Sequence, residues 1–262
     1  MQHGLWIRNG THDANAVLEM AVAADESGWD GVFVSDAVMM GSHTEPFTLL
    51  AAVAARTERV LLGTWVTPLI ARDVVHVARS AINVDHLSGG RLLLGLGLGN
   101  PEEHETLGVP RDRLGEHYDA AVEVLAALLA GEEVTRHDDW FDLDEVALGV
   151  RALQEPRPPI LIGCNWPAPA PMRRAARWDG AMPYWPGLGE GADPNVAEGA
   201  RDSKLRALLE VYRDAGGDGI VVAPTSARHG PEFTAVCEEL GVQWMLHCDA
   251  FDVAAVREWS PG

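Results

Sequence analysis

The stretch DHLSGGRLLLGLGLGN, residues 85–100, decides the fold class of this chain. It contains the end of a helical pattern that covers residues 71–87, the stop signal Gly89-Gly90, and the apolar run RLLLGLG at 91–97. That run is apolar on both faces, which is typical of a parallel strand covered on both sides. A helix that leads directly into such a strand predicts one repeat of an α/β fold.

The same alternation of short apolar runs and helical patterns continues in both directions. Strands are predicted at 4–7, 31–35, 60–66, 91–97, 159–163, 179–185, 219–224 and 242–247. Helices are predicted at 12–27, 45–57, 71–87, 112–130, 169–178, 201–215, 230–240 and 250–259. Residues 132–158 are expected to be irregular, and 187–199 a Gly-rich loop. Eight such units predict one closed (β/α)8 barrel over residues 1–262, in preference to an open doubly wound sheet.

Charge and composition exclude several classes of function. Hydrophobic residues make up 47% of the 262 residues, which is enough for one large core. The formal net charge of −19 repels nucleic-acid backbones and anionic membranes, so we expect neither as a partner. No segment reaches the ~20 apolar residues of a membrane span, and the first residues do not resemble a secretory signal. We therefore expect a cytoplasmic protein.

The cysteines indicate neither a disulfide framework nor a metal site. There are three, Cys164, Cys237 and Cys248, an odd number with wide spacings. Zinc sites need closely spaced pairs of ligands, which these positions do not provide. We expect no metal ion in this protein.

Several blocks of sequence, taken in order, resemble one known family. They lie at residues 34–36, 45–52, 55–57, 62–68, 85–91, 95–99, 158–163 and 173–180. Together they are similar to the bacterial-luciferase-like flavin-dependent monooxygenases and F420-dependent oxidoreductases, and the resemblance is strongest over residues 4–185. It implies a (β/α)8 barrel that holds FMN or the deazaflavin F420 at the carboxyl ends of its strands. It also implies a homodimer.

The resemblance implies nine cofactor-binding residues at three strand ends: Thr64, Trp65 and Val66; Gly97, Gly99 and Asn100; and Gly163, Cys164 and Asn165. In the family a non-prolyl cis peptide lies behind the flavin ring, and here we expect it between Trp65 and Val66. The glycines let the backbone approach a planar ring closely, although tight packing inside the barrel explains them equally well. The third group precedes a helix whose backbone N–H groups suit a phosphate. Arg173 and Arg174 on that helix add positive charge or, as the alternative, belong to a solvated face.

The sequence departs from the family at Asp36-Ala37. Many members have His after this Asp, and an imidazole suits acid–base catalysis at neutral pH. Because Ala37 stands there instead, we expect His43 in the following loop to take this role, with Asp36 as the second catalytic residue. The alternatives are an exposed His43 without a role and an Asp36 that orients a loop.

Three functions are compatible with these observations. The first is an FMN-dependent monooxygenase that acts on a small organic substrate, with reduced flavin supplied by a separate reductase. The second is F420-dependent hydride transfer, which the acidic composition and the single lysine, Lys204, make less favourable because F420 has an acidic tail. The third is a non-catalytic barrel that serves as a binding or partner subunit, a reading that Ala37 and the bulky Trp65 favour.

Overall fold

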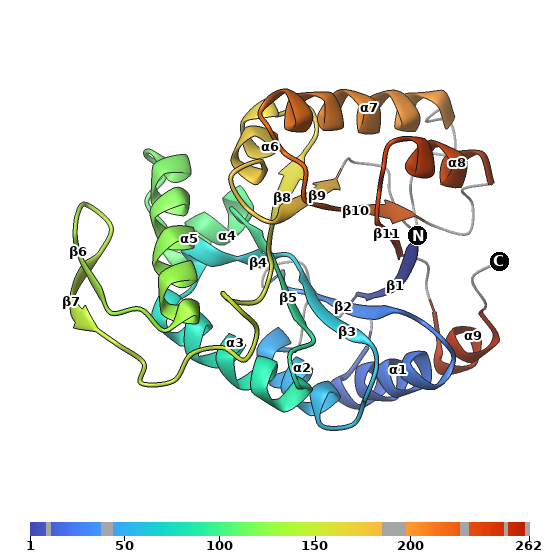
Figure 1. Ribbon diagram of the computed structural model, residues 1–262, viewed down its shortest axis with the longest axis horizontal. Helices are drawn as coiled ribbons and strands as arrows, with labels where there is room; N and C mark the ends of the chain where they lie inside the picture. The colour runs from blue at the N-terminus through green and yellow to red at the C-terminus, as the bar shows by residue number, and fades with distance from the viewer. Residues whose placement is uncertain (9–11, 38–43, 185–197, 226–230, 249–250, 260–262) are drawn as a thin grey trace.

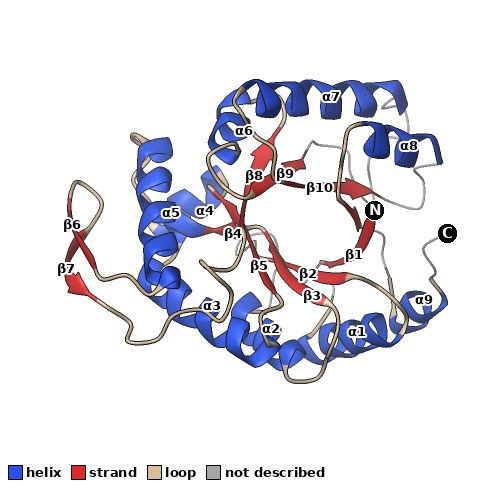
Figure 2. Cartoon of the chain, in the orientation of Figure 1, coloured by secondary structure: helices blue, strands red, loops and turns tan. Residues whose placement is uncertain are grey.

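A closed ring of parallel strands lies at the centre of the computed structural model, with helices around it (Figures 1 and 2). The structure describes residues 1–8, 12–37, 44–184, 198–225, 231–248 and 251–259. The strands of the ring are β1 (Gln2–Ile7), β2 (Gly31–Ser35), β3 (Leu61–Trp65), β4 (Thr67–Pro68), β5 (Leu92–Gly97), β8 (Ile160–Asn165), β9 (Gly180–Tyr184), β10 (Ile220–Thr225) and β11 (Trp244–His247). Their order is β3-β2-β1-β11-β10-β9-β8-β5-β4, and a further pairing of β3 with β5 closes the ring. β3 and β4 follow one another along the chain and both pair with β5, so together they count as one strand of the barrel. The nine strands of this sheet therefore form an eight-stranded barrel.

Helices connect these strands and cover the outside of the ring. They are α1 (Ala14–Glu26), α2 (Pro46–Ala54), α3 (Val74–Ser88), α5 (Leu114–Ala130), α6 (Pro169–Ala175), α7 (Glu198–Asp214), α8 (Pro231–Glu239) and α9 (Val253–Glu258). Each predicted strand and each predicted helix has its counterpart here, with small shifts at the ends. The predicted (β/α)8 barrel is confirmed.

Several elements lie where the sequence predicts none. The expected irregular connection at 132–158 contains an antiparallel hairpin of β6 (Val134–His137) and β7 (Asp142–Val146), outside the ring of helices (Figure 1). The prediction of irregular structure is wrong there, because exposed strands lack the apolar run by which buried strands are recognised. Between β5 and α5 there is also a short helix, α4 (Pro101–Leu107), and η1 (Leu69–Ala71) is a turn of 3₁₀ helix before α3.

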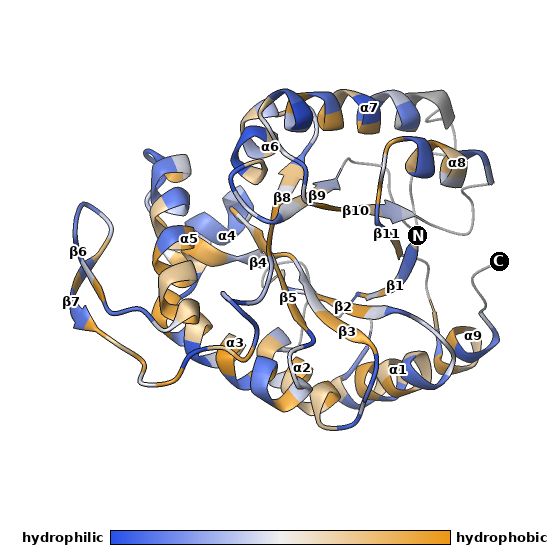
Figure 3. Ribbon diagram, viewed as in Figure 1, coloured by the Kyte–Doolittle hydropathy of each residue, from blue (hydrophilic) through white to orange (hydrophobic). Residues whose placement is uncertain are grey.

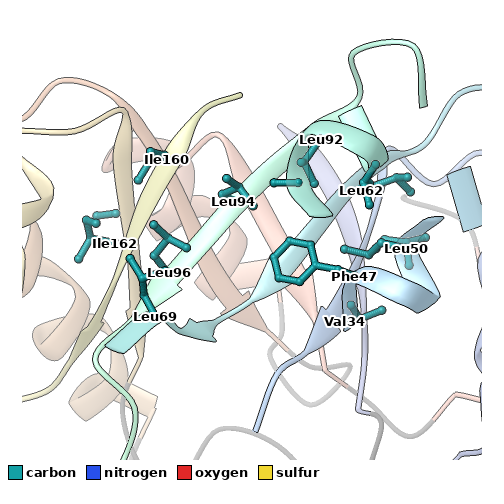
Figure 4. Close-up of a cluster of buried hydrophobic side chains, with 14 of the residues drawn as sticks. Val34, Phe47, Leu50, Leu62, Leu69, Leu92, Leu94, Leu96, Ile160 and Ile162 are labelled. Atoms are coloured by element: carbon teal, nitrogen blue, oxygen red, sulfur yellow. The ribbon is translucent and has the colours of Figure 1, made fainter. Parts of the chain in front are cut away.

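Apolar side chains pack in two layers, one inside the ring and one between the ring and the helices. The inner layer, which we call the inner cluster, consists of Trp6, Phe33, Trp65, Leu93, Leu161, Met182, Val222, Trp244, Leu246 and Cys248. In the outer layer, Val34 of β2 and Leu62 of β3 lie near Phe47 and Leu50 of α2, and the β8 side chains lie beside Leu94 and Leu96 of β5 (Figure 4). Along β1, for example, Leu5 and Ile7 belong to the outer layer and Trp6 to the inner one, as the two-residue period of a strand requires. This arrangement explains why most residues of the ring strands are apolar, as along β5 and β8 (Figure 3).

The motif at residues 85–91 stabilises the packing of the barrel. Asp85 is fully buried, and its carboxylate accepts hydrogen bonds from Leu153 N (2.7 Å), Gln154 N (3.0 Å) and Gln154 Nε2 (2.7 Å). The guanidinium of Arg91 donates to four backbone carbonyls, those of Ala54, Thr57, Val60 and Ser88. The motif therefore fastens the segment before β8 to α3 and joins α2 to β5.

Substituting Asp85→Asn is expected to lower the free energy of unfolding by about 2–3 kcal/mol. The carboxamide presents an N–H group to a site that three N–H donors already occupy, so at least one of them loses its acceptor. Urea denaturation followed by circular dichroism measures this loss. The matched control is Asp73→Asn, an exposed residue that caps α3 by accepting from His76 N. Asn caps helices as well as Asp does, so a loss in this control equal to that of Asp85→Asn would contradict the assignment.

Candidate functional site

β3 ends at the mouth of the barrel, by which we mean the end of the ring where its strands reach their carboxyl termini. The peptide bond between Trp65 and Val66 is cis, as predicted. The Val66 side chain lies against β5 and β8, where a Cβ atom added to Gly97 would be 2.6 Å from Val66 Cγ2 and one added to Gly163 would be 3.1 Å from it. Both glycines therefore make room for Val66, and their contact with a cofactor stays a prediction.

Thr64 joins β3 to β5 just before the cis bond. Its hydroxyl donates to Gly95 O (2.8 Å) and accepts from Gly95 N (3.1 Å), and the residue is fully buried. Regular pairing of these two strands ends one step earlier, at Gly63 and Leu93. The Thr64 side chain thus belongs to the barrel wall, and its contact with a cofactor stays a prediction.

Two indole rings close the inner cluster at the mouth. The ring centroids of Trp6 and Trp65 are 5.5 Å apart with an interplanar angle of 44°, and each residue is 7% exposed. Trp6 Nε1 donates to Ser35 Oγ at 2.7 Å, which fixes the orientation of that ring. The guanidinium carbon of Arg8 lies 5.2 Å from the Trp6 ring centroid. With two half-buried residues that pack on the same cluster, these rings form what we call the aromatic floor: Trp6, Trp65, Val66 and Tyr184.

Asp36 follows β2 at the mouth and is bound by Arg72. Its Oδ1 accepts from Arg72 Nη2 at 2.6 Å, and Arg72 Nη1 donates to Glu45 Oε1 at 3.1 Å. Glu45 is in turn the N-cap of α2, where its carboxylate accepts from Thr48 N at 2.7 Å. Burial raises the pKa of Asp36, while Arg72 and the Thr67 hydroxyl oppose that rise. One guanidinium therefore holds both the end of β2 and the start of α2.

Of the two predicted catalytic residues, Asp36 and His43, the structure describes only Asp36. Asp36 is 5% exposed and ion-paired, which agrees with the alternative that it orients the chain at the mouth. Ala37, at the position where the family has His, is half-buried. His43 lies outside the described residues, and its acid–base role stays a prediction.

Asn100 caps α4. Its side-chain oxygen accepts from Glu103 N (2.9 Å), and Glu103 Oε2 accepts from Asn100 N (3.0 Å), which together form a capping box. Gly99 has a φ of +87°, and a Cβ atom there would lie 3.2 Å from His104 Nε2. The sequence does contain this signal, because Asn followed by Pro101 and then by Glu at the third helical position is typical of a helix start. The predicted polar contact of Asn100 with a cofactor competes with this capping role.

The residues predicted to meet the phosphate lie in different environments. Cys164 is fully buried in the outer layer, where its thiol donates to Ile162 O at 3.1 Å and burial raises its pKa far above the ordinary value. Its side chain therefore points away from the mouth. Asn165, the last residue of β8, is exposed, and Gly163 is half-buried beside Val66.

The arginine expected to add charge near this strand end is engaged elsewhere. Arg174 of α6 donates to Asp119 of α5 through Nε (2.6 Å) and Nη2 (3.2 Å), and its guanidinium lies over the Tyr118 ring. Arg177 pairs with the same carboxylate. Arg174 thus joins two helices, and the expectation that it supplies free positive charge is wrong. Arg173 is exposed on α6.

A hollow of about 340 Å³ lies at the opposite end of the barrel, where the strands begin. It is lined by Gln2, Trp29, Asp30, Arg59, Leu61, Gly90 and Arg91. Arg91 is already used on backbone carbonyls, as described above. The predicted cofactor residues lie at the other end of the same strands, so this hollow is not the predicted site.

In the described part of the chain, no three or more His, Cys, Asp and Glu side chains are grouped so that they could hold a metal ion. None of its helices combines the length and the apolar character that crossing a bilayer requires. The three cysteines are buried.

Comparison with known proteins identifies similar sequences. The family model described as luciferase-like monooxygenase matches residues 1–213. A 4-hydroxyprotoasukamycin monooxygenase of Streptomyces nodosus subsp. asukaensis is 33% identical over 170 residues, 63% of this chain and 45% of that protein. An F420-dependent glucose-6-phosphate dehydrogenase of Beutenbergia cavernae is 33% identical over 201 residues, 71% of this chain and 59% of that protein. The chain spans about half the length of the curated relatives it matches.

Solved structures share the fold over nearly the whole chain. The monooxygenase RslO1 from Streptomyces bottropensis has a TM-score of 0.77 at 21% identity and covers 98% of this chain and 95% of its own. The coenzyme F420 dependent tetrahydromethanopterin reductase from Methanopyrus kandleri has a TM-score of 0.76 at 13% identity, with 98% and 96% covered. At these identities the likeness shows the fold alone.

Removing the guanidinium in Arg72→Met is expected to cost about 2–4 kcal/mol of unfolding free energy at pH 8, because a buried carboxylate then lacks its partner. Without Arg72 the pKa of Asp36 rises further, so the folded variant binds a proton that the unfolded chain has released. Its stability therefore falls as the pH rises above the unfolded value of about 3.9. The loss relative to the native chain should be smaller at pH 5 than at pH 8.

Urea denaturation at both pH values measures this difference. The control is Arg151→Met, which breaks an exposed pair with Glu155 and should cost less than about 1 kcal/mol at either pH. A cost for Arg72→Met that is the same at both pH values, or larger at pH 5, would show that Asp36 is not the group left unpaired.

Proposed function

The chain belongs to the luciferase-like monooxygenase family, and from that premise we propose that it is an FMN-dependent monooxygenase. In this proposal it uses reduced FMN and O2 to oxygenate a small organic substrate at the mouth of the barrel. Enzymes of this architecture have their active sites at the carboxyl ends of the strands. The relatives described above are named as a monooxygenase and as an F420-dependent dehydrogenase, so oxidoreductase chemistry is common to both.

The aromatic floor is the observation that carries this proposal. The ring system of FMN is planar and largely apolar, and ligand sites for such rings are lined mostly by apolar and aromatic side chains. The floor offers two indoles, a phenol ring and the Val66 side chain, above an inner cluster made only of uncharged residues. A surface of this kind excludes water from the reacting centre, which prevents wasteful side reactions there.

The described residues also fit the polar end of FMN, although with few charges. Asn165 is exposed at the end of β8 and Arg173 is exposed on α6, and these would meet the phosphate. When bound, reduced FMN supplies the electrons for the reduction of O2. The protein's part is to hold the ring on the floor and to keep water out, and His43 is proposed to move the proton.

A second candidate is F420-dependent hydride transfer. Its support is the 33% identity to the F420-dependent dehydrogenase of Beutenbergia cavernae over 201 residues. The acidic tail of F420 requires positive charge at the mouth, where Arg72 is already paired with Asp36 and Glu45. We therefore place FMN first. In either case we propose a homodimer, and for FMN a separate reductase as partner.

Titration of the purified chain with reduced FMN, FMN and F420, followed by fluorescence quenching, tests the proposal. We expect reduced FMN to bind in the micromolar range and F420 to bind at least about tenfold more weakly, because its acidic tail needs more positive charge than Arg173 supplies. Tighter binding of F420 would replace the first candidate by the second. Failure of all three to bind would contradict both and leave a non-catalytic barrel.

Gly97→Ala is expected to weaken FMN binding about tenfold. The added methyl would lie 2.6 Å from Val66 Cγ2, and a β-branched side chain has few other rotamers, so Val66 must move toward the space assigned to the ring. The double variant Gly97→Ala/Val66→Ala removes that conflict and should recover most of the affinity. Fluorescence titration measures both, with thermal unfolding as a check on folding. If the native chain and Gly97→Ala bind FMN with equal affinity, Val66 does not contact the flavin, and the prediction is contradicted.

A further inference from the structure

Two histidines, His3 of β1 and His247 of β11, contact one another on the outside of the ring. Nδ1 of His3 lies 3.0 Å from Nε2 of His247. Leu5 of β1 and Met245 of β11 belong to the outer layer, and the two-residue period of a strand places both histidines on that same side. Both are half-buried, so this histidine pair lies between the strands and the helices, apart from the candidate site.

Trp259, the last described residue of the chain, covers the histidine pair. The Trp259 ring centroid lies 4.7 Å from that of His247 and 5.5 Å from that of His3. Trp259 also stacks on Trp29, with centroids 3.7 Å apart and an interplanar angle of 22°. Trp29 is fully buried, and its Nε1 donates to Val256 O of α9 at 3.1 Å. The histidine pair therefore lies under the end of α9, the helix that runs beside α1 (Figure 1).

The contact between the two imidazoles limits how many protons the pair can hold. A hydrogen bond between two ring nitrogens needs one N–H donor and one nitrogen without a proton. Two imidazolium rings would instead place two N–H groups and two positive charges face to face at 3.0 Å. Burial lowers the pKa of His3; the Asp30 carboxylate opposes this effect and the N-terminal ammonium adds to it. The closed pair therefore takes up one proton but not two.

The other charged groups around the pair already have partners or are exposed. Oδ2 of Asp30, just before β2, accepts from the backbone N–H of His3 at 2.7 Å. Arg257 of α9 pairs with Glu26 of α1 at 3.1 Å. The remaining charged side chains of α9 and its cap are Asp252, which accepts from Ala255 N, and the exposed Glu258. Because imidazoles titrate between pH 5 and 8 and carboxylates do not, the histidines are the groups that respond to pH there.

From this geometry we infer that the histidine pair is a pH-sensitive contact, which holds α9 and Trp259 on the barrel at neutral pH and releases them in acid. When the second proton enters, the bond between His3 and His247 breaks, the rings separate, and Trp259 loses the surface on which it lies. The inference goes beyond the proposed function and needs neither flavin nor substrate. Since β1 and β11 both end at the mouth, release of α9 removes outer packing from two strands that form the site.

The direction of the pH effect follows from the number of protons bound. In acid the closed pair holds one proton fewer than two separated histidines, whose ordinary pKa is about 6.5. The stabilisation of the closed state is therefore complete above pH about 6.5 and is lost as the pH falls below that value. Between pH 7.5 and pH 5.5 the population of the open state should rise about five- to tenfold relative to the closed one.

Hydrogen–deuterium exchange of the full chain, read by mass spectrometry and corrected for the intrinsic rate at each pH, measures this opening. We expect the protection of amides in residues 251–259 to fall about five- to tenfold from pH 7.5 to pH 5.5. His3→Gln and His247→Gln should each reduce this fall to less than about twofold, because a glutamine carbonyl accepts from the remaining imidazolium at both pH values. Trp259→Leu should lower the protection at both pH values.

The matched control is His76→Gln, which replaces an exposed histidine of α3 whose Nδ1 lies 3.3 Å from Asp73 Oδ1. This variant should keep the whole fall in protection. The inference is overturned if the protection of residues 251–259 in the native chain does not change with pH, if both glutamine variants of the pair keep the fall, or if His76→Gln removes it. A fall that Asp249→Asn abolishes and His3→Gln leaves intact would assign the effect to a carboxylate and overturn the inference equally.

Discussion

Inside the ring of parallel strands there is room for only a few large side chains, and glycines on neighbouring strands provide that room. Phe33 lies where a Cβ atom on Gly63 or Gly4 would be, and Trp244 lies where one on Gly31 would be. Large residues of the inner cluster thus face glycines on the neighbouring strands. A side chain added at any of these glycines would have to displace an aromatic ring, so the filling of the ring is tightly constrained.

The side chains at the mouth are the last ones that fill the interior of the barrel. There Val66 packs against Gly97 and Gly163, at the point where β3 stops and β4 begins. The indoles of Trp6 and Trp65 lie beside Val66 at this end of the barrel. The carboxylate of Asp36, which follows β2 there, binds Arg72 and is not open to solvent. The apolar character of the floor is therefore a consequence of how the barrel is filled, and it favours contact with a planar, apolar ring.

Much of this fold could be predicted from the sequence, because strands buried on both faces are apolar throughout and stand out between helical patterns. The hairpin of β6 and β7 could not, since its exposed strands carry no such run. At the site, Asn100 had a readable capping signal, while Asp36 did not reveal its partner, because Arg72 lies 36 residues away in sequence. The outward direction of Cys164 follows from the two-residue period of β8 once Gly163 is known to face Val66, which only the packing of the ring reveals.

The most direct test of this account is a crystal structure of the chain with FMN. The flavin ring is expected at the mouth, in contact with Val66 and beside Trp65, with its phosphate near Asn165. Density for the ring in the hollow at the other end of the barrel, lined by Asp30 and Arg59 among others, would contradict it. A mouth that stays without flavin at concentrations far above the measured dissociation constant would contradict it equally.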